Sequence, residues 1–287
     1  MSACIILNPS SGYAFKQRRI QKWLAENLPP SVTLFKTEYA GHAALLAQQA
    51  REERYDRVIA IGGDGTVNEV ASQLVHAGTA LGIIPAGSGN GLARSLNLPL
   101  SVGKAFDTAL SGKTRMIDVG RAGERYFFAV CGVGLDAVIG LRFQRLKTRG
   151  IIPYFYFGLR EFLKYDYPTF TVISDDQKMT VAPLTLVVSN GMEFGNGARI
   201  APQALMDDGL LDICILERMS FLHTARALPK LFNGDIVNEK SYNSFRCRSL
   251  EIVPERENFL YHVDGEPFRK QGALKITMHP KALKVIV

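Results

Sequence analysis

The stretch Val58–Ala71, VIAIGGDGTVNEVA, passes from an apolar run through a Gly-Gly-Asp-Gly-Thr turn into a pattern typical of a helix. A strand that ends in glycines and leads into a helix is an arrangement in which backbone N–H groups bind phosphate. The acid at position 64 is unexpected there, because a carboxylate repels a phosphate. The stretch therefore admits three interpretations: a nucleotide site, a metal site or a tight turn alone.

The same rhythm extends over residues 3–118. Helical patterns lie near 15–27, 42–53 and 67–76, with short helical pieces further on. The strand-like runs between them are ACIIL (3–7), VTLFK (32–36), RVIAI (57–61) and LGIIP (81–85). This alternation predicts a three-layer α/β domain, in which helices cover both faces of a mostly parallel sheet. The loops that follow the strands then lie at one edge of the sheet, where such folds bind ligands.

From residue 119 the pattern changes to strand-like runs separated by turns. These runs are FTVIS (170–174), LTLVV (184–188), LLDICIL (210–216), SLEIV (249–253), FLYHV (259–263), ALKIT (273–277) and LKVIV (283–287). They predict a C-terminal antiparallel β-sandwich or clam domain. We expect a nucleotide-binding α/β domain over residues 1–118, which the last strand near 283–287 rejoins, and a β-rich domain over 119–282.

The composition is that of an ordinary globular protein, with 287 residues of which 47% are hydrophobic and 21% charged. No run approaches the ~20 consecutive apolar residues that a membrane span needs. The first residues, MSACIILNPSSG, lack a basic segment before the apolar run, so they indicate a first strand rather than a signal peptide. The four cysteines are scattered singly and are expected in the core. A cytoplasmic protein is expected.

The net charge is +7, and basic residues cluster at 16–22 and 142–150. Most such residues are expected on solvated helix faces. The clusters also suit a polyphosphate or an anionic membrane surface, where each basic side chain contributes ~1 kcal/mol. No reader motif for nucleic acid is present, so nucleic acid is not an expected partner.

Three strands of the first domain end in loops of small residues, namely NPSSG (8–12), GGDGT (62–66) and PAGSGN (85–90). One such loop is more often a plain turn, but three on one sheet edge favour an anion site. They match neither the P-loop nor the dinucleotide fingerprint. Mg²⁺ takes one or two carboxylates together with phosphate oxygens, so Asp64 suggests a magnesium nucleotide. A helix cap is the alternative role for Asp64.

Together, GGDGTVNEV, NPSSG and GSGN resemble the diacylglycerol kinase catalytic family, in particular the small bacterial lipid kinases. Sphingosine kinases and, more distantly, NAD kinases share the GGDG-type loop. The resemblance covers nearly the whole chain, through RMIDVGR (115–121), SNGMEFGNGARIAPQALMDDGLLDICIL (189–216) and HVDGEP (262–267). One departure is Gly91, because diacylglycerol-type bacterial kinases commonly carry an Asp after the Asn of GTxND. GSGNG is nearer the sphingosine kinase version.

The resemblance implies ATP as phosphoryl donor, Mg²⁺, and a fold like that of NAD kinases and diacylglycerol kinases. It implies that Glu266 is the proton acceptor, and that Asp118 and Asp64 belong to the catalytic water and metal network. A structural metal is implied at the Asp208 side chain with the carbonyls of Leu205 and Leu210. The implied nucleotide contacts are Asn8, Pro9, Ser10, Ser11, Gly12, Thr37, Gly63, Asp64, Gly65, Thr66, Val67, Asn68, Glu69 and Ser88.

The leading hypothesis is a lipid kinase that acts on a diacylglycerol-like lipid, phosphatidylglycerol or a sphingoid base. The alternatives are an NAD-kinase-like enzyme with a soluble substrate and a nucleotide-binding regulatory module without turnover. The aromatic stretch 151–163 and the segment 219–232 are candidates for an acyl pocket, a membrane-facing surface or plain core. Arg142, Arg145, Lys147 and Arg149 are expected to favour peripheral binding to an anionic membrane. A second copy of the chain is also admitted as a partner, and His262 is interpreted as a strand residue rather than a base.

Overall fold

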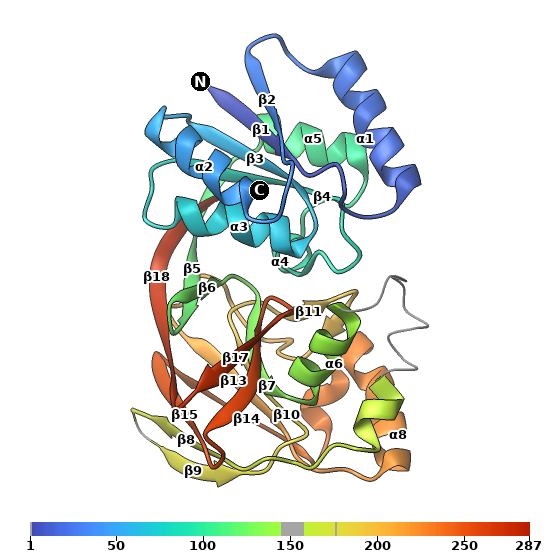
Figure 1. Ribbon diagram of the computed structural model, residues 1–287, viewed down its shortest axis with the longest axis vertical. Coiled ribbons are helices and arrows are strands. Elements are labelled where there is room, and N and C mark those ends of the chain that lie inside the picture. Colours follow the sequence, from blue (N-terminus) through green and yellow to red (C-terminus); the bar gives the residue numbers. More distant parts are fainter. Residues whose placement is uncertain (1, 145–157, 176) are drawn as a thin grey trace. The chain divides into compact units, whose positions relative to one another are not determined.

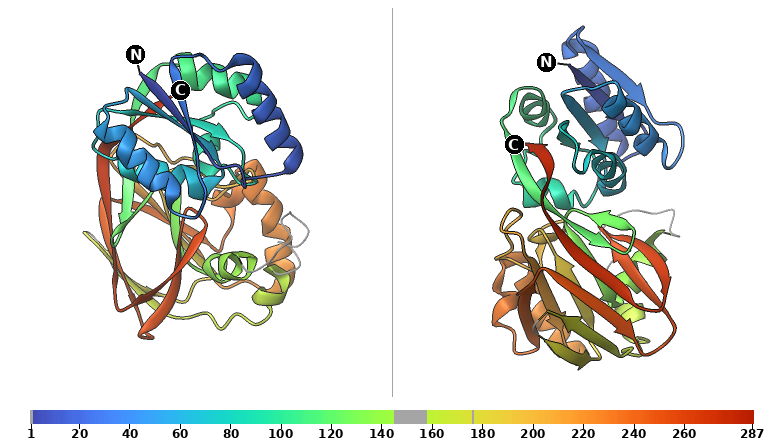
Figure 2. Two further views of the ribbon diagram at one scale, coloured as in Figure 1. Left: turned by 45° about the horizontal axis from the view of Figure 1, so that its top comes forward. Right: turned by 90° about the vertical axis from the view of Figure 1, so that its left-hand side faces the viewer.

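The computed structural model describes residues 2–144, 158–175 and 177–287 (Figure 1). The chain forms two compact units. One comprises the chain up to Val119 together with Pro280–Val287, and the other comprises Gly120–His279. The last strand, β18 (Leu274–Ile286), red in Figure 2, contributes residues to both.

The first unit is built on a parallel sheet in the order β2-β1-β3-β4, which β18 extends by pairing Val285 with Leu81. Its strands are β1 (Ala3–Leu7), β2 (Val32–Lys36), β3 (Arg57–Gly62) and β4 (Ala80–Pro85). Its helices are α1 (Ala14–Asn27), α2 (His42–Glu52), α3 (Asp64–Leu74), α4 (Gly91–Ser95) and α5 (Val102–Ser111). The predicted α/β domain with a mostly parallel sheet is confirmed.

Side chains of β1 alternate between two buried faces of this sheet. Ile5 and Leu7 belong to a core cluster with residues of α1 and α5. In that cluster the Trp23 ring stacks on Phe106 with a centroid distance of 3.6 Å. On the other side α2 and α3 pack on each other, α2 contacts β1 and α3 contacts β3. Because both faces are covered, β1, β3 and β4 consist of buried residues throughout. This explains why each is mainly apolar in the sequence, apart from the buried Arg57 at the start of β3.

The second unit is mainly antiparallel. Strand β5 (Thr114–Ala122) contributes residues to both units, because the second unit begins at Gly120. The further elements of this unit along the chain are β6 (Arg125–Phe127), β7 (Val130–Gly134), α6 (Leu135–Gln144), β8 (Phe170–Ser174), β9 (Lys178–Val181), β10 (Thr185–Ser189), β11 (Glu193–Gly195), β12 (Ala198–Arg199), β13 (Leu211–Leu216), α8 (Phe221–Asn233), β14 (Tyr242–Cys247), β15 (Ser249–Pro254), β16 (Asn258–Val263) and β17 (Glu266–Gln271). Residues 158–162 are also helical. A six-stranded sheet has the order β14-β13-β10-β7-β16-β17, and β15, β8 and β9 continue in order from β18 in a second sheet.

One core cluster joins the inner faces of these two sheets. It contains Leu186 and Ile213 from the six-stranded sheet and Val172, Ile252 and Ile276 from the other. A second cluster covers the opposite face of the six-stranded sheet with residues of α6 and α8. The predicted antiparallel sandwich is therefore confirmed, and the burial of both faces explains why β7, β10 and β13 are buried along their whole length.

Two elements differ from the expectation. The runs 273–277 and 283–287 belong to one strand, β18. In addition, α3 begins at Asp64 rather than near residue 67. Asp64 is therefore the first residue of a helix and not the middle of a loop.

The four cysteines are buried and form no disulfide, as expected for core residues. Burial raises the pKa of the Cys4 and Cys214 thiols to about 12, which makes them poor nucleophiles. Among the described residues, no helix has the length and apolarity required to cross a membrane.

Glu239 fastens α8 to the segment that follows it. Its carboxylate lies 2.8 Å from Lys230 Nζ and 2.8 Å from His223 Nε2, one oxygen to each. The hydrogen bond from Lys230, and after it that from His223, lowers the pKa of Glu239 to about 2. A pKa below the ordinary 4.5 means that this group stabilises the fold above pH 4.5 and ceases to do so as the pH falls toward 2.

We therefore expect Glu239→Gln to lower the free energy of unfolding at neutral pH by about 1 kcal/mol, a value kept small because both partners are partly solvated. Urea unfolding at pH 7 and again near pH 3 should show that the difference in unfolding free energy between variant and wild type becomes smaller in acid. Glu124→Gln, at an exposed turn, is the matched control and should change little. A difference that stays constant with pH would contradict the assignment.

Candidate functional site

The loops after β1, β3 and β4 are bonded together at the carboxyl edge of the parallel sheet. The Asn8 amide Nδ2 donates to the Thr66 hydroxyl at 2.9 Å, and its Oδ1 accepts the Ser10 N–H at 2.9 Å. The N–H groups of Ala86 and Gly87 both donate to the Gly62 carbonyl. The three small-residue loops of the sequence are thus one connected structure.

Glycine is required where these loops touch. Gly12 has a φ of 73°, and a Cβ on it would lie 1.8 Å from the Ala86 carbonyl oxygen. A Cβ on Gly87 would lie 2.6 Å from the Cα of Gly63. Gly65 is different, because a Cβ there would meet no atom within 4 Å. The first turn of α3 therefore opens onto free space at Gly65, while the backbone around it is packed tightly.

Asp64 connects the GGDG turn to α4. Its Oδ2 accepts the Asn90 N–H at 2.8 Å, and its Oδ1 accepts the Gly91 N–H at 2.6 Å. The N–H groups at a helix start lack partners within the helix, so a carboxylate there satisfies them and interacts favourably with the helix dipole. Asp64 therefore caps α4, and it does so from the first turn of a different helix.

Glu69 and Thr37 hold the loop after β2 at the same edge. Glu69 Oε1 accepts the Gly41 N–H at 3.1 Å, and the Thr37 N–H donates to the Leu7 carbonyl at 2.9 Å. The ring of Tyr39 stacks on His42 with a centroid distance of 4.6 Å. Asn68 lies one turn into α3 and accepts a hydrogen bond from Ser72.

The predicted nucleotide residues are therefore gathered at this edge and differ in exposure. Pro9, Ser10, Gly65 and Ser88 are exposed, whereas Ser11, Thr37, Thr66 and Val67 are buried. Asn8, Gly12, Gly63, Asp64, Asn68 and Glu69 are intermediate. The exposed members present two hydroxyls and a glycine to solvent.

Asp118 lies in β5 and is completely buried. Its Oδ1 accepts the N–H of Lys281 at 2.6 Å, and Lys281 has a left-handed backbone with a φ of 46°. Both residues belong to the first unit. Whatever further role Asp118 has, it fixes the backbone of β18 at this residue.

In the second unit, the HVDGE motif forms the hairpin between β16 and β17. Asp264 and Gly265 are the two turn residues, with φ of 47° and 84°, and both signs are positive as in the tight hairpin turn that Asp-Gly favours. The Asp264 carboxylate accepts the N–H groups of Phe128, Ala129 and Val130 at 2.9–3.0 Å. This turn delivers Glu266, the first residue of β17, to an exposed position.

His262 is a strand residue, as interpreted from the sequence, but its ring is bonded on both sides. It is 3% exposed; Nε2 lies 2.9 Å from Asp136 Oδ2, and Nδ1 accepts the Gly265 N–H at 3.3 Å. Asp136 was not a candidate from the sequence. The available signal was an acid in the first turn of a helix that follows a strand of small residues, CGVG.

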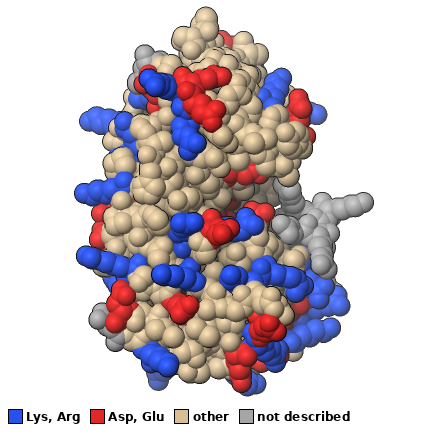
Figure 3. All heavy atoms as spheres, turned by 60° about the vertical axis from the view of Figure 1, so that its left-hand side comes forward, with Lys and Arg blue, Asp and Glu red and all other residues tan. Residues whose placement is uncertain are grey.

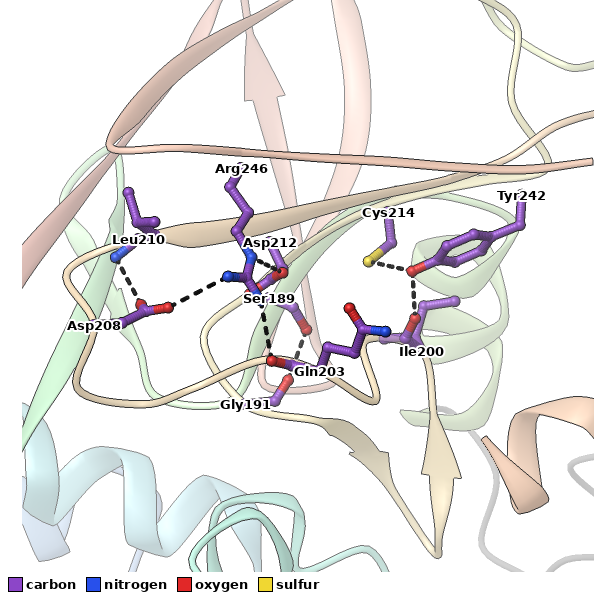
Figure 4. Close-up of polar contacts among 10 residues, drawn as sticks. All are labelled: Ser189, Gly191, Ile200, Gln203, Asp208, Leu210, Asp212, Cys214, Tyr242 and Arg246. Carbon is purple, nitrogen blue, oxygen red and sulfur yellow. Dashed lines mark hydrogen bonds and ion pairs between the residues drawn. The ribbon is translucent and has the colours of Figure 1, made fainter. Parts of the chain in front are cut away.

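The MDDGLLD turn, where a metal was expected, carries a network around Arg246 (Figure 4). Asp208 Oδ1 accepts the Leu210 N–H at 3.0 Å, and Asp208 Oδ2 lies 3.8 Å from an Arg246 nitrogen. Arg246 also donates to Asp212 at 2.8 Å and to the Gln203 carbonyl at 3.1 Å. Burial raises the pKa of Asp212, although the bond from Arg246 opposes that rise.

No cluster of three or more His, Cys, Asp or Glu side chains suited to a metal occurs in residues 2–144, 158–175 and 177–287. Leu205 is 53% exposed, and its role with Asp208 and Leu210 stays a prediction. Arg145, Lys147, Arg149 and the aromatic residues of 151–157 lie outside the described residues.

Comparison with known proteins agrees with this architecture. Residues 2–122 match the diacylglycerol kinase catalytic domain, and residues 129–287 match the YegS C-terminal NAD kinase beta sandwich-like domain. A diacylglycerol kinase of Bacillus subtilis is 30% identical over 272 residues, which cover 92% of this chain and 89% of that one. A probable YegS-like lipid kinase of Chromohalobacter salexigens is 34% identical over 240 residues, covering 79% and 75% of the two chains.

Among solved structures, a putative diacylglycerol kinase from Bacillus anthracis has the same fold, with a TM-score of 0.79 at 22% identity over 99% of this chain and 96% of that one. The two domains and their order define a lipid kinase architecture. The chain belongs to the family of diacylglycerol kinases and YegS-like lipid kinases.

The packing of the loops can be tested with two alanine substitutions. Gly12→Ala should lower the free energy of unfolding by about 2 kcal/mol or more, because the methyl group meets the Ala86 carbonyl and the backbone is left-handed. Gly65→Ala has room and a helical backbone, so it should be neutral or stabilise by up to about 1 kcal/mol. Urea unfolding of both variants provides the measurement. Equal free energies of unfolding for the two variants would contradict the close packing of the loops at Gly12.

Proposed function

We propose that this chain is an ATP- and Mg²⁺-dependent lipid kinase that transfers the γ-phosphoryl group to a lipid hydroxyl at a membrane surface. The proposal rests on one observation: this chain, which belongs to the family, has both structural features that the reaction requires. One is a glycine-lined loop edge beside a helix N-terminus, and the other is an exposed carboxylate, Glu266, at the end of a rigid hairpin.

The loop edge fits the phosphates of ATP. The backbone at Gly65 is open to solvent, and it lies in the first turn of α3, where backbone N–H groups and the helix dipole favour an anion. Ser10 and Ser88 add exposed hydroxyl donors. When bound, ATP would supply the γ-phosphoryl group. The chain's own residues would orient it.

Mg²⁺ prefers one or two carboxylates together with phosphate oxygens and waters. Asp64 is a carboxylate at the loop edge, and the N–H groups of Asn90 and Gly91 hold it in place there. Its two backbone bonds fix its orientation in advance. We propose that Asp64 and the buried Asp118 organise the metal and its waters in this way.

Glu266 is the proposed base. Phosphoryl transfer needs little covalent chemistry from the protein, but a carboxylate that accepts the proton of the acceptor hydroxyl assists it. An exposed side chain at a strand end can reach a substrate, and the Asp264 clamp on three N–H groups keeps its backbone fixed.

The acceptor is proposed to be a diacylglycerol-like lipid, phosphatidylglycerol or a sphingoid base. The relatives named diacylglycerol kinase favour the first. Gly91, where diacylglycerol-type enzymes commonly have an acid, starts α4 and donates its N–H to Asp64. The chain has no carboxylate at this buried position, so phosphatidylglycerol and a sphingoid base are retained as candidate acceptors.

A surface for the membrane is offered by four exposed apolar side chains of the second unit. Leu159, Leu163, Phe221 and Leu222 are 43%, 69%, 46% and 67% exposed. The two segments that carry them adjoin, because the rings of Phe162 and Phe221 are 6.2 Å apart. On the face shown in Figure 3, basic and acidic side chains are interspersed, so charge alone would give only weak attraction to an anionic membrane. We propose that insertion of the four apolar side chains adds to this attraction.

Glu266→Gln should reduce transfer from ATP to dispersed diacylglycerol by at least about 10²-fold, since it removes the proton acceptor but keeps the shape of the side chain. ATP affinity, measured by calorimetry, should remain unchanged. Glu257→Gln, at another exposed position of the same unit, is the control. Near-wild-type turnover in the Glu266→Gln variant would remove Glu266 as the base, and transfer to NAD instead of any lipid would refute the lipid kinase.

Membrane binding is tested by Leu163→Asp and Leu222→Asp. Each should weaken sedimentation with vesicles of phosphatidylcholine and phosphatidylglycerol by about tenfold or more, because an exposed leucine that inserts contributes roughly 1.5–3 kcal/mol. Leu45→Asp on α2 is the matched control, with a leucine that is 55% exposed. Equal vesicle binding by all three variants would place the membrane contact elsewhere.

A further inference from the structure

The hairpin that carries Glu266 has a second support besides Asp264. The ring of His262, on the strand that leads into the turn, accepts the N–H of Gly265 at Nδ1. Gly265 is the residue directly before Glu266. Each of the two turn residues therefore has a separate attachment: Asp264 through its carboxylate and Gly265 through its N–H.

The bond from Gly265 determines which nitrogen of the neutral His262 ring carries the proton. Because Nδ1 accepts a hydrogen bond, the proton of the neutral imidazole is on Nε2, which donates to Asp136 Oδ2 at 2.9 Å. The other oxygen of Asp136 accepts the N–H of Ala137 at 2.9 Å at the start of α6. The chain of contacts thus runs from the start of α6 through Asp136 and His262 to the turn.

Two glycines make room for this arrangement. A Cβ on Gly132 of β7 would lie 2.8 Å from both His262 Nε2 and Asp136 Oδ2. A Cβ on Gly140 of α6 would lie 3.4 Å from the Gly265 carbonyl oxygen. Helix α6 therefore approaches the turn closely at Gly140 and also supports it through Asp136.

We propose that His262 is a positioning residue for phosphoryl transfer, which holds the Gly265 N–H and thereby fixes where Glu266 meets the acceptor hydroxyl. The inference rests on the proposed function, in which Glu266 is the base. His262 is 3% exposed and acts through the backbone of the turn rather than on the substrate. Because a base misplaced by about 1 Å can lose about 10²-fold in rate, the bond to Gly265 is expected to appear in kcat.

Two substitutions separate the bonds of the ring. His262→Asn places an amide oxygen near the position of Nδ1, where it can accept from Gly265, but it does not reach Asp136. His262→Gln places an amide nitrogen near the position of Nε2, where it can donate to Asp136, but it leaves the Gly265 N–H without its acceptor. We expect the Asn variant to retain kcat within about threefold and the Gln variant to lose about tenfold or more, with KM for ATP unchanged in both.

Amide hydrogen exchange at Gly265, followed by NMR on the whole chain, gives a readout that does not depend on turnover. Exchange should be slow in the wild type and the Asn variant and faster in the Gln variant. Equal kcat values or equal Gly265 exchange in the two variants would overturn the proposal. If the wild type phosphorylates no lipid, the proposed function fails and the catalytic role of His262 fails with it, whereas the exchange data still decide whether His262 holds the turn.

Discussion

The carboxylate of Asp264 is the interaction on which the second unit's site depends. It accepts three consecutive backbone N–H groups, Phe128 to Val130, and so ties the hairpin turn to the start of β7. A carboxylate that accepts several N–H groups forms charge-assisted bonds, which are stronger than neutral ones. These three bonds hold the two turn residues, both of which have positive φ, in one position. Because the turn is held in this way, the positions of His262 on β16 and of Glu266 on β17 are determined as well.

The first unit uses the same device in another place. Asp64 accepts the N–H groups of Asn90 and Gly91, and this connects the turn after β3 to the loop after β4. Asp64 of the GGDG motif and Asp264 of the DGE motif thus both hold backbone segments in place. A site built in this way is preorganised, which is what phosphoryl transfer demands of a protein that contributes mostly position and charge.

Much of the fold could be predicted because several of its strands are buried on both faces and therefore contain continuous apolar runs, as in residues 58–61 and 213–216. The glycine loops could be placed on one edge because parallel strands share their carboxyl ends. The bond between His262 and Asp136 could not, since 126 residues separate them and the HVDGEP motif that contains His262 gives no indication of its partner. Nor could the start of α3 at Asp64, because glycines on either side of an acid suggest a loop until the partners of its carboxylate are known.

The most direct test of the central claim is the identity of the product. A total lipid extract, incubated with the chain, Mg²⁺ and ATP labelled with ¹⁸O in the γ-phosphoryl group, can be analysed by mass spectrometry. The account predicts a labelled phosphomonoester on a lipid hydroxyl, formed by the wild type and not by the Glu266→Gln variant. Label that appears only in soluble compounds, or in no product at all, would contradict it.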